Sequence, residues 1–89
     1  MLESEENFEN GKVFLAEQKY NEAIKMFSKS LSMNKNNYDA LFYRAVSNLD
    51  SGQAAKAIID LNDLVEKCPD YRKTMFIVLS IAYRRINDY

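Results

Sequence analysis

Two acidic side chains in the second half of the chain have a spacing that could support metal binding. Asp60 and Asp63 lie three residues apart, so a helix would place both carboxylates one turn apart on the same face. The sequence contains no histidine, the commonest metal ligand and acid–base residue. Carboxylates on helices are usually solvated. We therefore interpret both residues as solvent-exposed and predict no metal site.

The single cysteine also offers little chemistry. Cys68 cannot form a disulfide within the chain, and only Lys67 hints at the electropositive setting that a reactive thiol needs. No glycine-rich phosphate loop is present, so we predict that the protein is not an enzyme and holds no cofactor. An acidic start, Glu3 to Glu6, and the lack of a long apolar run argue against a signal peptide or membrane span. We expect a cytoplasmic protein that does not bind membranes.

Aromatic residues could stack on nucleic-acid bases, and the chain has six tyrosines and five phenylalanines. Binding to a phosphate backbone also needs a basic surface, whereas the formal net charge is −1 at pH 7. Aromatic residues at helical spacing are more often core or groove residues. We therefore predict that the partner is not nucleic acid.

The elements that position these residues are expected to be helices. The 89 residues are 47% hydrophobic and include only two glycines and one proline, which favours a single all-α domain over many short strands. Apolar periodicity and turn residues predict helices at 4–17, 21–34, 38–50, 54–67 and 71–87. The connections are short, so neighbouring helices should be antiparallel.

An internal repeat appears when the sequence is compared with itself at a shift of 34 residues. Small residues match small ones and large apolar residues match large ones. The matched pairs are Gly11 with Ala45, Leu15 with Leu49, Ala23 with Ala57, Ile24 with Ile58, Phe27 with Leu61, and Leu31 with Val65. A third copy begins at a shift of 35 and breaks off where Tyr89 corresponds to Ala54. An ordinary helical bundle would show apolar stripes, but it gives no reason for this register.

This pattern resembles the tetratricopeptide repeat (TPR) family. The residues that match the family motif are Gly11, Phe14, Ala23 and Phe27 in the first repeat, and Ala45, Ala57 and Pro69 in the second. The departures are Asn7, Asn10 and Lys35 in the first repeat, and Arg44 and Asn48, in place of Leu and Tyr, in the second.

The resemblance implies antiparallel helical hairpins stacked as a short right-handed superhelix. The chain would form one TPR domain over 1–89, with about two and a half repeats at 4–37, 38–71 and 72–89. Helical hairpins of a different period are a less favoured alternative.

The resemblance also implies a protein-binding groove lined by the first helix of each repeat. An apolar groove of this kind would hold a peptide or an amphipathic helix of a partner protein. The corresponding inward positions are Glu5, Phe8, Lys12, Leu15, Asp39, Phe42, Tyr43, Val46, Leu49, Thr74, Ile77, Ile81 and Arg84. Any one of these side chains could instead be buried between helices.

The last predicted helix is apolar around much of its circumference, which predicts a homodimer formed through this helix. The expected contact residues are Met75, Phe76, Val78 and Leu79. We also expect the natural chain to continue past Tyr89, in which case such a dimer would reflect where the chain ends. In the alternative function, the chain is a structural or self-association segment of a longer repeat protein and has no ligand of its own.

Overall fold

The computed structural model describes residues 3–87, which form five helices. They are α1 (Glu3–Ala16), α2 (Tyr20–Met33), α3 (Tyr38–Asp50), α4 (Ala54–Lys67) and α5 (Lys73–Asn87). The all-α prediction is confirmed, and α3 and α4 have the predicted bounds. Helices α1 and α2 begin one residue earlier than predicted, and α5 begins two residues later. Tyr89, where the third repeat was expected to break off, lies outside the described residues.

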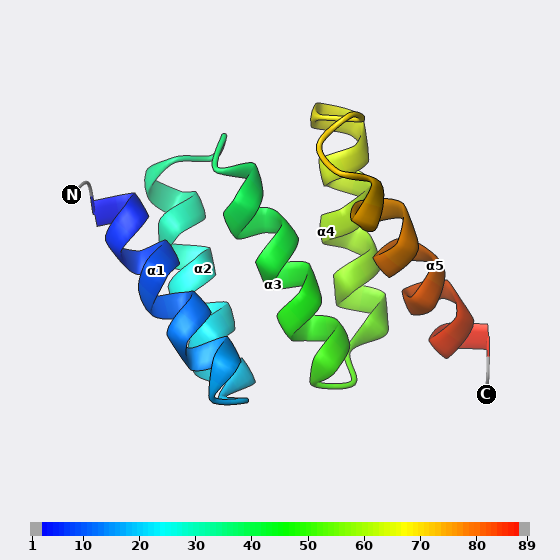
Figure 1. Cartoon of the computed structure of the whole chain (residues 1–89), viewed down its shortest axis with the longest axis horizontal. Helices are drawn as coiled ribbons and strands as arrows, with labels where there is room; N and C mark the ends of the chain where they lie inside the picture. Colours follow the sequence, from blue (N-terminus) through cyan, green and yellow to red (C-terminus); the bar gives the residue numbers. More distant parts are fainter. Residues whose placement is uncertain (1–2, 88–89) are drawn as a thin grey trace.

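The helices follow one another along the longest axis of the molecule, with α1 and α5 at opposite ends (Figure 1). The molecule measures 41 × 28 × 18 Å along its principal axes. Helix α1 packs on α2, and α3 packs on α4, so that each pair forms a hairpin; α3 also packs on α2, and α5 on α4. Helices α2 and α4 do not pack on each other, because α3 lies between them.

Local sequence explains the turns between these helices. Asn37 caps α3, since its side chain accepts a hydrogen bond from the Ala40 N–H at 3.1 Å. Gly52 has a φ of +89° in the turn between α3 and α4, a conformation that glycine adopts without strain. Helix α4 ends at Lys67, because Pro69 disfavours helical geometry in the residue before it.

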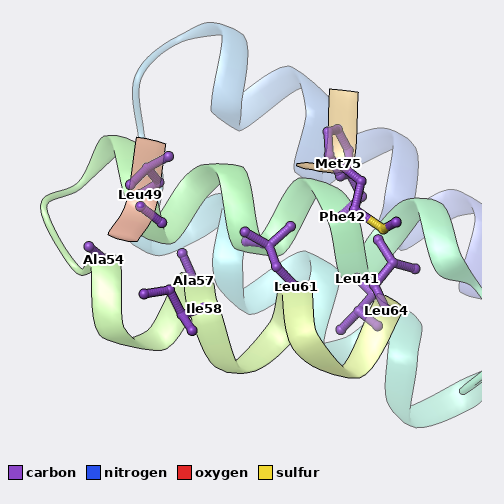
Figure 2. Packing of buried hydrophobic residues seen from close by; sticks show 11 residues of the cluster. Leu41, Phe42, Leu49, Ala54, Ala57, Ile58, Leu61, Leu64 and Met75 are labelled. Carbon is purple, nitrogen blue, oxygen red and sulfur yellow. The ribbon is translucent and has the colours of Figure 1, made fainter. Parts of the chain in front are cut away.

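The buried hydrophobic side chains form two clusters. Ala23, Phe27 and Ala40 form the smaller cluster beneath α1. The larger cluster joins α3, α4 and α5, and Figure 2 shows its side chains facing one another. Met75 is fully buried in it, beside Phe42. The expectation that Met75 lies on the outer face of the last helix is therefore wrong, because the first turn of α5 directs it toward α3 and α4.

Gly11 allows the closest approach within the first hairpin. A Cβ atom at this position would lie 2.5 Å from Cε1 of Phe27, which is fully buried. No side chain larger than hydrogen fits there unless Phe27 moves. The small residue predicted at this helix contact is therefore required by the packing.

None of the helices within residues 3–87 has the length and apolar character needed to cross a bilayer.

Candidate partner-binding face

An aromatic row crosses the first helices of the two hairpins. The ring centroids of Phe8 in α1 and Tyr43 in α3 lie 5.7 Å apart, and those of Tyr43 and Phe42 also lie 5.7 Å apart. Phe42 continues to Tyr71, just before α5, at 5.6 Å. Phe27 supports the row from α2, with its ring 5.9 Å from that of Phe8. Such pairs favour a fixed arrangement of rings, so the row connects α1 of the first hairpin to α3 of the second and to the segment before α5.

A hollow of about 520 Å³ lies beside this row, and both of its outer rings, Phe8 and Tyr71, line the hollow. Helices α1 and α3, the turn between α2 and α3, and the segment before α5 enclose it. Its lining residues are Glu5, Phe8, Glu9, Asn34, Asn36, Asn37, Tyr38, Asp39 and Tyr71. The structure thus brings together three of the predicted groove positions, Glu5, Phe8 and Asp39. Carboxylates and amides stand beside the rings, so this end of the face is more polar than the predicted apolar groove.

Two cationic side chains lie over aromatic rings of this face. Lys12 Nζ lies 4.9 Å from the centroid of Phe8 and 3.3 Å from Glu9 Oε1. The Arg72 guanidinium lies 5.0 Å from the centroid of Tyr71, and its Nη2 lies 3.3 Å from Asp39 Oδ1. Each cation therefore contacts both the face of an aromatic ring and a carboxylate. Both pairs are exposed, so their individual contribution to stability is small.

Tyr71 is a functional candidate that is absent from the predicted groove residues. Its hydroxyl donates a hydrogen bond to Asp39 Oδ1. Burial of the phenol, and then this hydrogen bond, raise the pKa of Tyr71 above its ordinary value of about 10. The hydroxyl is therefore a protonated donor at neutral pH. The sequence carried one weak signal, an aromatic residue directly after the Pro69–Asp70 turn.

The remaining predicted groove residues differ in their exposure. Phe42 and Leu49 are only 7% and 4% exposed, so they belong to the core and support the face from beneath. The half-buried residues that pack against the cores are Leu15, Val46 and Ile81. Ile77 and Arg84 are exposed on α5, and the Ile77 side chain is 59% exposed. The structure therefore leaves a narrower accessible face than the sequence predicted.

Asp60 does not have the solvated environment that was predicted for it. Arg44 Nε and Nη2 each donate a hydrogen bond of 2.8 Å to one of its two carboxylate oxygens, and Asp60 is buried. The prediction is wrong because α4 turns this residue toward Arg44 of α3. Asp63 instead pairs with Lys67 at 3.3 Å on the surface. Residues 3–87 contain no group of three His, Cys, Asp or Glu side chains that could hold a metal ion.

Comparisons with known proteins agree on one architecture. The Tetratricopeptide repeat family model matches residues 14–73. A crystal structure of the Sgt2 TPR domain from Aspergillus fumigatus superposes with a TM-score of 0.90 and 28% sequence identity. The match covers all of this chain and 58% of that one. No curated protein matches. Neither the family model nor the similar structure indicates a catalytic domain.

Proposed function

The chain belongs to the tetratricopeptide repeat family, and we propose that it binds a peptide or amphipathic helix of a partner protein on the face formed by α1, α3 and α5. TPR domains are generally protein–protein interaction modules. The observation that carries the proposal is the aromatic row from Phe8 to Tyr71, which extends across both hairpins. Aromatic anchors of this kind supply much of the binding energy at protein interfaces.

The residues proposed to contact the partner are those of the predicted set that keep accessible surface. They are Phe8, Lys12, Leu15, Asp39, Tyr43, Val46, Ile77, Ile81 and Arg84, joined by Tyr71. Phe42 and Leu49 are buried beneath these residues and support them. Isoleucine and valine on α3 and α5 extend the aromatic row with apolar surface, which suits the spaced anchors of an amphipathic helix. The cytoplasmic location stays a prediction from the sequence.

The proposal can be tested with a matched pair of variants on opposite faces. Ile77 on α5 and Ile59 on α4 are 59% and 69% exposed, so glutamate at either position should leave the fold intact. Peptides that bind the immobilised chain are selected from a random library, and their affinity is measured by fluorescence anisotropy. We expect Ile77→Glu to weaken binding about tenfold, or about 1.4 kcal/mol, and Ile59→Glu to leave it unchanged.

The opposite pattern would contradict the proposal. If Ile77→Glu binds as tightly as the parent chain while Ile59→Glu does not, the partner uses the face of α2 and α4. Phe42→Glu is a poor choice for this test, because Phe42 is buried and a charge there would unfold the chain. Equal thermal midpoints of the two variants show that any difference in affinity does not arise from unfolding.

Self-association through α5 is a second candidate function. Phe76 is 50% exposed on this helix, whereas Val78 and Leu79 are half-buried against the core and Met75 has no exposed surface. Docking of a second copy would cover the exposed half of Phe76, which gives about 0.8–1.5 kcal/mol, half of the value for a fully exposed large apolar side chain. Light scattering across a dilution series tests this function. A mass that falls with dilution supports a dimer, and a constant monomer mass rejects it.

A further inference from the structure

A second hollow, of about 350 Å³, lies between α2 and α4. The two helices do not pack on each other, and Arg44 and Asn48 of α3 line the space between them. The lining residues are Asn21, Ile24, Ser28, Arg44, Asn48, Gln53, Lys56, Ile59 and Asp60. None of them belongs to the face proposed to bind a peptide or helix. This hollow is therefore a separate candidate site.

The floor of the hollow is made by the two departures from the family motif in the second repeat. Arg44 and Asn48 stand where the motif has Leu and Tyr, and they lie four residues apart, on one side of α3. Asparagine is much smaller than tyrosine, so it leaves space that a phenol ring would fill. A guanidinium and a small amide thus replace a leucine and a tyrosine at the floor of the hollow.

Asn48 is the most informative residue in this hollow. It is only 5% exposed, yet the hydrogen bonds that it accepts from Ser51 and Gln53 go to its main-chain carbonyl, and its side-chain amide has no partner among the described residues. No fully enclosed side-chain nitrogen or oxygen among the described residues lacks a partner. The amide atoms of Asn48 therefore keep some accessible surface, and Asn48 is one of the residues that line the hollow. A nearly buried amide without a protein partner indicates that water or a ligand pairs with it there.

The charged groups that line the hollow are two cations, Arg44 and Lys56, and one carboxylate, Asp60, so its net charge is positive. A guanidinium has five N–H groups, and Arg44 uses two for Asp60 and one for Ser28. Two N–H groups of Arg44 and both of Asn48 are left. Lys56 adds an ammonium that forms no ion pair with any described residue. Asp60 balances only one of the two cations, so a carboxylate complements the hollow in both charge and hydrogen bonding.

Apolar side chains lie next to these donors. Ile59 is 69% exposed and Ile24 is half-buried, and both line the hollow. We propose that the hollow between α2 and α4 binds an acidic side chain of a partner protein, with the apolar residue next to it covering Ile59. The carboxylate accepts hydrogen bonds from Asn48 and Arg44 and pairs with Lys56. This second site does not depend on the function proposed for the face of α1, α3 and α5.

The probe is a blocked tripeptide with a central glutamate between two leucines, and the control has glutamine in its place. These two peptides differ in charge and not in shape. The ¹⁵N-labelled chain is titrated with each, and the side-chain signals of Asn48 and Arg44 are followed by NMR. We expect saturable shifts of both signals with the glutamate peptide, and affinity about tenfold weaker with the glutamine peptide.

Asn48→Tyr fills the hollow with the residue usual in the family, so it should abolish the shift at Arg44 while the helical circular dichroism stays unchanged. If the tyrosine variant does not fold, the Asn48→Ala variant is tested in its place. Ile77→Glu, on the other face, should not change this binding. Equal affinity for both peptides, or no saturable shift up to about 10 mM, would overturn the proposal. Retained binding by the folded Asn48 variant would overturn it too.

Discussion

The first hairpin places Gly11 of α1 against Phe27 of α2, whereas the second has Ala45 in α3 and Leu61 in α4 at the corresponding positions. The hairpin with the larger residue on its second helix, Phe27, thus has the smaller residue on its first helix, Gly11. Both pairs fill a similar volume, and all four residues are buried. The two repeats therefore keep the summed volume of the two residues similar, although the residue at each single position differs.

The hairpins also differ in what holds them together. Among the described residues, α1 buries only Ser4 and Gly11, whereas α3 buries seven residues, most of them apolar. The Ser4 and Ser30 hydroxyls each donate to the other residue's main-chain carbonyl, at 3.0 and 2.8 Å. Asn37 donates to the Ser30 hydroxyl at 2.9 Å and also caps α3. A polar network thus links the first hairpin to α3, while apolar packing dominates the second.

The largest effect is expected from the apolar core of the second hairpin. Leu61→Ala removes a fully buried side chain and should lower the free energy of unfolding by about 2–5 kcal/mol. Urea denaturation measures the change. Lys56→Ala on the same helix should change stability by less than about 0.5 kcal/mol. A similar loss for both variants would mean that the apolar core does not dominate this hairpin.

The polar network of the first hairpin should produce the next largest effect. Ser30→Ala leaves the Asn37 amide and the Ser4 carbonyl without their partner, at a cost of about 1–3 kcal/mol. Ser32→Ala is the matched control, because its exposed hydroxyl bonds only to the carbonyl of Lys29. Thermal unfolding compares the two variants. If they unfold at the same temperature, the network does not stabilise the first hairpin.

The pairing of small and large residues predicts a coupled effect. Gly11→Ala should collide with Phe27, at a cost of about 1–3 kcal/mol. Alanine also gains about 1 kcal/mol in helix propensity, so the net loss should be about 0–2 kcal/mol. Phe27→Leu in the same chain recreates the pair of the second hairpin, so the double variant should be more stable than the two single losses predict. A double-mutant cycle measures this coupling. Strict additivity would show that the two positions are independent.

The smallest effect concerns the contact between Tyr71 and Asp39, which joins α3 to the segment before α5. Because the pKa of Tyr71 is higher in the folded chain than in the unfolded one, its stabilisation is fully present below about pH 10 and is lost as the pH rises further. Tyr71→Phe should cost less than about 1 kcal/mol at pH 7. In a spectrophotometric titration, this variant should lack the last tyrosine to ionise. Loss of an earlier step would contradict the assignment.

Much of the fold could be predicted because its signals are local. Apolar periodicity, Asn37 and Pro69 place the helices within two residues of their observed bounds. The shift of 34 residues also identifies Gly11 and Ala57 as positions of close packing. These features depend on neighbours along the chain or on the repeat itself, so one sequence is enough to find them.

The site was harder to predict because burial depends on helices that meet only in three dimensions. Periodicity puts Phe42 and Leu49 on the correct face of α3, but it cannot show that α4 and α5 cover them. Met75 is misplaced for the same reason. Arg44 and Asp60 are 16 residues apart, and only the packing of α3 on α4 makes them a pair. Departures from the family motif, such as Arg44 and Asn48, were the best available signal.

The claim that the first helices of the hairpins form the partner-binding face can be tested by mapping a bound peptide. A peptide selected for binding is added to the ¹⁵N-labelled chain, and the changes in backbone and side-chain signals are assigned to residues. We predict the largest changes at Phe8, Tyr43 and Ile77, and none at Ile59. Changes confined to α2 and α4, with the aromatic row unaffected, would contradict the claim.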